Sequence, residues 1–175
     1  MNTRSPFLWL CGPMGVGKSS VGWEIFTQLR NAGIKIGYAD ADQLGICYPV
    51  PEDDPVNHRV KSRNVGAVYR NFRDAGARCF ILSGSVSSAE EAQMYRDQTP
   101  GAALTICMLH AEPRVIKERF LRRGWNPHLV DEAIREVAEL DRTKFADLRV
   151  DTDDHSVKEV ARMVRAQASN WPGLT

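Results

Sequence analysis

A glycine-rich segment near the start of the chain carries the residue types best suited to binding phosphate. It fits the pattern G-x-x-x-x-G-K-[ST], with glycines that let the backbone curl so that several N–H groups face a phosphate. Its lysine can reach the β- and γ-phosphates, and its serine hydroxyl can bind Mg²⁺. We therefore expect a nucleoside triphosphate site built from Gly12, Met14, Gly15, Val16, Gly17, Lys18, Ser19 and Ser20.

Two carboxylates follow the next apolar run of the chain, in the segment Tyr38-Ala39-Asp40-Ala41-Asp42. In a parallel sheet the carboxyl ends of the strands face the ligand crevice, so both acids are expected to lie near Lys18. Asp40, with Ser19, is the candidate ligand for Mg²⁺, and Asp42 is the candidate to orient or deprotonate an attacking hydroxyl. The alternative is an ordinary polar turn, where Asp is common.

A third group of charged residues lies in Glu118-Arg119-Phe120-Leu121-Arg122-Arg123-Gly124. Phosphoryl transfer spreads negative charge over the γ-phosphoryl oxygens, and planar arginine side chains can neutralise it. We expect Arg119 and Arg123 to contact phosphate, Arg122 less so, within a lid at about residues 119–130 that shuts out water. The alternative is a solvated helix end, where arginine suits the helix dipole.

An acceptor pocket is expected between residues 43–70 and the segment that follows the third apolar strand. Arg59 and Arg63 are four residues apart on one helix face, and with Lys61 and Arg70 they give this region positive charge that suits an anionic acceptor. A solvated helix face is the alternative. The segment after the strand can hydrogen-bond an acceptor through Ser83, Gly84 and Ser85.

Other polar and aromatic residues are given structural roles. Tyr48 and Trp125 can stack on the ring of a ligand, although packing within the protein is the simpler expectation. The four histidines show no pattern of catalytic or metal-binding residues and are expected at the surface or in turns: His58, His110, His128 and His155. No C-x-x-C pair is present, so Cys11, Cys47, Cys79 and Cys107 are expected to be buried free thiols.

Short apolar runs alternate with helical patterns along the chain, which predicts a parallel sheet covered by helices on both faces. In one predicted helix, ending near Ala32, Val21, Ile25 and Leu29 form an apolar stripe. The other predicted helices cover about residues 56–75, a short stretch after Ser88, 113–124, 129–143 and 156–168. The predicted strands are Phe7–Cys11, Ile34–Ala39, Arg78–Leu82, Ala103–Leu109 and Leu148–Val150.

Composition limits the class of protein. The 175 residues form a single expected domain (1–175), in which 23 basic and 22 acidic side chains nearly balance, so no nucleic-acid partner is expected. No apolar stretch is long enough to cross a membrane, and the N-terminus lacks a signal-peptide pattern, which favours a cytoplasmic protein without a membrane partner.

Two classes of nucleotide hydrolase lack support in the sequence. No N-K-x-D segment is present to read guanine, as a signalling GTPase would need. Motor and remodelling ATPases usually end an apolar strand in Asp-Glu, whereas the strand Cys79–Leu82 continues into Ser83-Gly84-Ser85.

The chain resembles the small-molecule kinases of the P-loop nucleoside-monophosphate-kinase-like fold, a group that includes adenylylsulfate, gluconate and shikimate kinases and chloramphenicol phosphotransferase. Asp40-Ala41-Asp42 is similar to the acidic element after the second strand of these kinases, and Val150-Asp151-Thr152 to the segment that flanks adenine. The resemblance implies a three-layer α/β fold with five parallel strands in the order 2-3-1-4-5. It also implies a nucleotide contact at Asp151.

The resemblance implies an ATP- and Mg²⁺-dependent phosphotransferase that acts on a small-molecule acceptor, through a hydroxyl, as a monomer or homodimer. Lys18, Asp42, Arg119 and Arg123 are the expected catalytic residues. Two alternatives stay open: a nucleoside monophosphate kinase, in which a phosphate attacks, and a regulatory or resistance protein that binds ATP without transferring phosphate.

Overall fold

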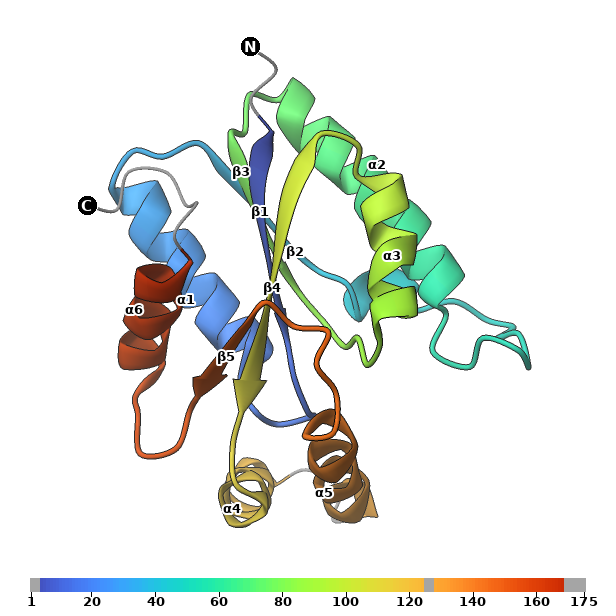
Figure 1. The fold of residues 1–175 in the computed structure, drawn as a ribbon, viewed down its shortest axis with the longest axis vertical. Coiled ribbons are helices and arrows are strands. Elements are labelled where there is room, and N and C mark those ends of the chain that lie inside the picture. The colour runs from blue at the N-terminus through green and yellow to red at the C-terminus, as the bar shows by residue number, and fades with distance from the viewer. Residues whose placement is uncertain (1–3, 125–127, 169–175) are drawn as a thin grey trace.

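The protein, described here from a computed structural model, is built on a central parallel sheet (Figure 1). The structure describes residues 4–124 and 128–168. The five strands of the sheet lie in the order β2-β3-β1-β4-β5, which confirms the predicted α/β fold and its strand order. The strands are β1 (Ser5–Cys11), β2 (Ile36–Asp40), β3 (Cys79–Ser83), β4 (Ala102–His110) and β5 (Leu148–Asp151).

Helices cover both faces of the sheet, and two further helices lie beyond the carboxyl end of β4 (Figure 1). On one face α1 packs against α6, on the other α2 packs against α3, and α4 pairs with α5. The helices are α1 (Lys18–Asn31), α2 (His58–Asp74), α3 (Ala89–Gln98), α4 (Pro113–Arg123), α5 (His128–Leu140) and α6 (Val157–Gln167), with a 3-10 turn η1 (Gln43–Gly45).

The central strand β1 is apolar and buried from Phe7 to Cys11 because both of its faces are covered. Successive side chains of a strand point to opposite faces. Leu8 and Leu10 therefore join the core under α1 and α6, whereas Phe7 and Trp9 join the core under α2 and α3. This double burial explains why the sequence shows a continuous apolar run here and no alternation.

Glycines and capping residues end and begin the helices where the sequence predicted them. Gly33, Gly76 and Gly124 follow α1, α2 and α4 with positive φ angles of 76°, 91° and 64°. Ser156 and Glu159 form the expected capping box at the start of α6, and Ser88 accepts the N–H of Glu91 at the start of α3. These positions fix where the helices begin and end.

Four expectations about individual residues were wrong or could not be placed. Cys47 is exposed rather than buried because it lies in the irregular segment before α2, while the other three cysteines are buried. Tyr48 in the same segment is 92% exposed, so it does not pack. His58 is buried at the start of α2 and is not a surface residue. Trp125 lies outside the described residues.

The described helices were also compared with the dimensions of a lipid bilayer. None of the helices within residues 4–124 and 128–168 combines the length and the apolar character needed to cross a membrane.

Candidate active site

The phosphate loop joins the carboxyl end of β1 to the start of α1. Gly12, Gly15 and Gly17 have φ angles of 134°, 81° and 109°, a region that side chains with a Cβ rarely adopt. A Cβ on Gly12 would also collide with the carbonyl of Leu109. Lys18 Nζ donates to the carbonyl oxygen of Gly12 at 2.8 Å, so its charge lies over the loop. The glycines are therefore required by the shape of the loop.

The ends of β2 and β3 bring a carboxylate and a hydroxyl to the same edge of the sheet, where the start of α1 adds a second hydroxyl. Asp40 is the register partner of Ser83, and Ser83 Oγ donates to Asp40 Oδ2 at 2.8 Å. Ser19 Oγ donates to the same oxygen at 2.6 Å. The prediction that Asp40 lies beside the phosphate loop is thus met in the geometry.

These oxygens fit a magnesium ion. Mg²⁺ prefers hard oxygen ligands and is usually held by one or two protein groups together with substrate phosphates and water. Ser19 and Asp40 supply such a pair at the mouth of the phosphate loop. Within the described residues there is no group of three or more His, Cys, Asp or Glu side chains that could hold a metal by itself.

Asp42 lies two residues farther on and is held from two sides. Lys61 Nζ, on a side chain that is buried, donates to Asp42 Oδ1 at 2.9 Å. Ser85 donates its N–H to Oδ1 at 3.3 Å and its hydroxyl to Oδ2 at 3.4 Å. Burial alone would raise the pKa of Asp42, but the hydrogen bond and charge of Lys61, with the charge of Lys18, hold it below its usual range. Asp42 is therefore an ionised acceptor whose orientation is fixed.

Several of the predicted residues line one cavity of about 380 Å³ above the phosphate loop. They come from three separate parts of the chain, and the cavity also contacts Gly15, Gly17 and Ser20. The side chains that face it from these parts include Lys18, Ser19, Asp40, Asp42 and Arg123. A phosphate group in this space would meet cationic, hydroxyl and carboxylate groups in the arrangement that phosphoryl transfer requires.

Arg119 lies on the other side of the loop. Its guanidinium donates to the carbonyl oxygen of Val16 at 3.1 Å, to Thr152 Oγ1 at 2.9 Å and to the carbonyl oxygen of Thr152 at 2.8 Å. It lines a second cavity, of about 320 Å³, with Val160 of α6 and Arg122. Arg119 thus connects helix α4 to the phosphate loop and to the segment after β5.

Asp151 does not line either of these two cavities, whereas its neighbour Thr152 lines the second. Asp151 Oδ1 accepts the N–H of Asp153 at 2.8 Å, and its Oδ2 lies 3.8 Å from His110 Nδ1. The side chain of Asp151 is therefore used in the turn after β5.

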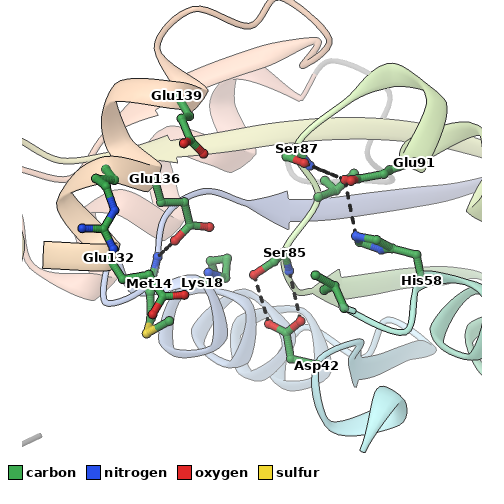
Figure 2. Close-up of a pocket in the computed structure, with 13 residues that line it drawn as sticks. Met14, Lys18, Asp42, His58, Ser85, Ser87, Glu91, Glu132, Glu136 and Glu139 are labelled. Atoms are coloured by element: carbon green, nitrogen blue, oxygen red, sulfur yellow. Dashed lines mark hydrogen bonds and ion pairs between the residues drawn. The ribbon is translucent and has the colours of Figure 1, made fainter. Parts of the chain in front are cut away.

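A larger cavity, of about 750 Å³, adjoins Lys18 and Asp42 (Figure 2). One wall is a hydrogen-bonded network. His58 Nδ1 lies 3.0 Å from Tyr95 Oη and His58 Nε2 lies 3.4 Å from Glu91, which accepts the N–H and hydroxyl of Ser87. Burial lowers the pKa of His58, so the ring is neutral at neutral pH. This wall is rigid and polar.

The opposite wall is helix α5, which presents Glu132, Glu136 and Glu139 (Figure 2). Glu136 accepts the backbone N–H of Met14 at 2.7 Å, and burial raises its pKa. These three acids were not predicted from the sequence as site residues. Their spacing of four and three residues places them on one helix face, but only the position of α5 shows that this face meets the phosphate loop.

Arg59 and Arg63, expected at the acceptor pocket, are not among the residues that line this cavity. Arg59 pairs instead with Asp53, at 2.6 Å, and with Asp54, at 3.5 Å. Arg63 is exposed on α2. Of the segment after β3, Ser85 faces the cavity, Ser83 binds Asp40, and the carbonyl of Gly84 accepts the indole N–H of Trp9 at 3.1 Å.

Comparison with known protein families gives one match to this sequence. The sequence profile described as an AAA domain matches residues 8–140, from β1 through the end of α5. No curated protein matches the sequence at a significant level.

Solved structures with the same fold cover nearly the whole chain. The tunicamycin resistance protein of Deinococcus radiodurans is 23% identical, with a TM-score of 0.70 over 94% of this chain and 95% of that one. A gluconokinase from Sinorhizobium meliloti 1021 is 21% identical (TM-score 0.64, 95% and 93% coverage). The APS kinase CysC of Mycobacterium tuberculosis, solved with AMPPNP and APS, is 19% identical (TM-score 0.63, 93% and 96% coverage). These neighbours show that the chain has the fold expected from the resemblance.

Proposed function

This chain belongs to the AAA domain family of P-loop proteins, and from that premise we propose that it transfers the γ-phosphate of Mg·ATP to a hydroxyl of a small molecule. The observation that carries the proposal is the cavity above the phosphate loop, where Lys18, Asp40 and Asp42 face the same space. The structural neighbours named as gluconokinase and APS kinase support a kinase of small molecules.

The proposed reaction uses the chain mainly to position charge. Lys18 and the N–H groups of the loop bind the β- and γ-phosphates, and Arg123 neutralises charge on the transferring group. Mg²⁺, held by Ser19 and Asp40 with phosphate oxygens, would offset the charge that develops on the leaving ADP.

Asp42 is the residue that binds the acceptor hydroxyl and takes its proton. Its carboxylate accepts a hydrogen bond from the acceptor hydroxyl, which aims the oxygen at the γ-phosphorus. As the new O–P bond forms and the β–γ bridging bond breaks, the hydroxyl proton passes to Asp42 and then to water. Lys61 and Ser85 keep the carboxylate oriented for this step.

The proposal is tested in two stages. Calorimetry with Mg·AMPPNP measures nucleotide binding, and an assay of ADP release with Mg·ATP is run against sugars, amino sugars, nucleosides, nucleoside monophosphates and organic acids. We expect Mg-dependent nucleotide binding and acceptor-dependent ADP release. Absence of nucleotide binding would overturn the proposal.

Two other outcomes of the same assay identify the alternatives. ADP release confined to nucleoside monophosphates indicates a kinase with a phosphate acceptor. Nucleotide binding without ADP release for any class of acceptor indicates a protein that binds ATP without transferring phosphate. The tunicamycin resistance protein among the structural neighbours makes nucleoside antibiotics a useful addition to the panel.

A further inference from the structure

The cavity of about 750 Å³ next to Lys18 and Asp42 is the place where an acceptor would meet the phosphate. Pockets of about 300–1,000 Å³ hold ligands of the size of a drug or an oligosaccharide. The cavity opens between α5 on one side and the starts of α2 and α3 on the other (Figure 2). Its size and its position show that a ligand belongs there, and its lining then indicates the charge of that ligand.

Acidic side chains dominate the lining of this cavity. Five carboxylates face it, whereas Lys18 and Arg135 are its only lysine and arginine among the described residues. Lys18 is committed to the phosphate loop, and Arg135 lies three and four residues from two of the acids on its own helix. The five carboxylates are those of Asp42, Glu91, Glu132, Glu136 and Glu139.

Of the basic residues of α2, Lys61 offsets the charge of one of these acids, and Arg59 is paired elsewhere. Lys61, whose side chain is buried, gives its ammonium group to Asp42 at 2.9 Å. Arg59 is paired with Asp53 and Asp54, outside the cavity lining. A carboxylate, phosphate or sulfate group on an acceptor would therefore face acidic side chains on both walls, and these outnumber the two basic residues in the described lining, Lys18 and Arg135.

Helix α5 carries three of these acids on one face, at i, i+4 and i+7. Like charges at this spacing each destabilise a helix by about 0.2–0.5 kcal/mol. Within the described residues none of the three makes an ion pair, and the one hydrogen bond they receive is that from Met14 N to Glu136. A cation bound in the cavity would relieve this repulsion.

The cation that fits is an organic one. In the described part of the chain, no three His, Cys, Asp or Glu side chains come close enough to hold a metal ion, so the cavity acids do not converge on a point. They are spread along a wall and face a space of ligand size. Clefts lined by one sign of charge raise the local concentration of the opposite ion.

Building on the proposed function, we propose that the acceptor is a polyhydroxylated molecule that carries at least one ammonium group. Its ammonium group lies against Glu132, Glu136 and Glu139 of α5, and the hydroxyl to be phosphorylated lies at Asp42. Ser87 and Glu91 on the opposite wall accept hydrogen bonds from its other polar groups. Nucleoside monophosphates and carboxylated sugars are rejected by the same wall.

Three probes of similar size and different charge test this directly. Kanamycin, maltotriose and trigalacturonate each contain three rings and carry ammonium groups, no charge and carboxylates, respectively. Their dissociation constants are measured by calorimetry, with and without Mg·AMPPNP. We expect kanamycin to bind about tenfold or more tightly than maltotriose, trigalacturonate not to bind, and the preference to shrink in about 0.5 M KCl.

Charge variants on α5 assign the preference to the wall. The double variant Glu132→Gln/Glu139→Gln should weaken kanamycin binding about tenfold and leave maltotriose binding within about twofold. Asp131→Asn is the matched control, because it removes one charge from the same helix outside the cavity lining and should not change the preference. Circular dichroism checks that each variant is folded.

The two proposals fail in different ways. If kanamycin binds no more tightly than maltotriose, or if the double variant keeps the preference, the ammonium proposal is wrong even when Mg·AMPPNP binds normally. If Mg·AMPPNP does not bind while kanamycin is preferred and the double variant loses that preference, the cavity selects cations but the kinase proposal is wrong.

Discussion

The two halves of the crevice differ in charge and in how they are built. In the nucleotide half, basic side chains lie around the phosphate loop: Lys18, Arg119, Arg122 and Arg123. In the acceptor half, five carboxylates line the cavity. The largest single part of the nucleotide half is one contiguous segment, residues 14–21, whereas the acceptor half is made of side chains far apart in the sequence. A shared fold can therefore keep one half constant while the other half changes its ligand.

Replacement of the loop lysine should have the largest effect and should act on the nucleotide half alone. Lys18→Met removes the charge that lies over the phosphate loop, so ADP release should fall by about 10³-fold. Binding of the acceptor-side probe kanamycin should persist, because the acids of α5 remain. An equal loss of ADP release and of kanamycin binding would show that the two halves are not separate. Lys18→Arg serves as the charge-conserving control.

Asp42 is the residue where the halves meet. Asp42→Asn removes the proton acceptor and should lower kcat by about 10²-fold with a smaller change in the KM for ATP. Steady-state rates with a hydroxyl acceptor from the panel measure this. A loss of less than about threefold would argue that a phosphate rather than a hydroxyl attacks, because a phosphate needs no base.

The role of Lys61 beside Asp42 can be tested through the pH dependence of the reaction. Lys61→Met removes the hydrogen bond and charge that hold the pKa of Asp42 low, so burial then raises that pKa. The acidic limb of the kcat/KM profile should move toward neutral pH, with a loss of about tenfold at neutral pH. Lys61→Arg, which keeps the charge, should retain the wild-type limb. An unchanged limb in Lys61→Met would show that Asp42 does not titrate in the reaction.

Arg119 tests whether α4 belongs to the nucleotide half. Arg119→Lys cannot reproduce the three hydrogen bonds of the guanidinium to Val16 and Thr152, so Mg·AMPPNP affinity should fall about fivefold. Probe binding in the acceptor cavity should be unchanged. Calorimetry on both ligands measures the two effects, and weaker binding of the probe alone would contradict this assignment.

The smallest effect is expected in the scaffold of the acceptor half. Asp54 accepts the N–H groups of His58 and Arg59 at 2.8 and 2.9 Å, so Asp54→Ala should cost about 1–2 kcal/mol of stability. Burial raises the pKa of Asp54, but hydrogen bonds from the backbone of Arg59 and His58 lower it overall.

The sign of the pH effect follows from that lowered pKa. The contribution of Asp54 is full above the ordinary carboxyl pKa and is lost as the pH falls through the folded-state value. Urea unfolding at several pH values should therefore show wild type and Asp54→Ala converging in acid. A constant difference would mean that the cap does not depend on charge.

The fold and the nucleotide half could be predicted because their signals are local. The alternation of apolar runs with helical patterns specifies a parallel sheet, and the spacing of Gly12, Gly17 and Lys18 specifies the phosphate loop. Asp40 and Asp42 followed from the rule that strand ends meet at one edge. Each of these inferences needs only neighbours in the chain.

The acceptor half could not be predicted, because its contacts depend on where helices lie. Lys61 and Asp42 are 19 residues apart, and only the placement of α2 beside η1 brings them within 2.9 Å. Arg59 was expected at the acceptor because it lies four residues from Arg63 on one helix face, and its pairing with Asp53 across an irregular turn leaves no sequence pattern. The acids of α5 have a visible spacing, but nothing local shows what they face.

Glu136 links the two substrates through a single backbone group. Its carboxylate accepts the N–H of Met14, which belongs to the loop whose N–H groups are proposed to hold phosphate. A phosphate that takes this N–H must displace a carboxylate of the same sign, and the displaced acid then gains freedom on the α5 wall. Nucleotide arrival would thus prepare the second binding event, and initial-rate kinetics should show ordered addition with the nucleotide first.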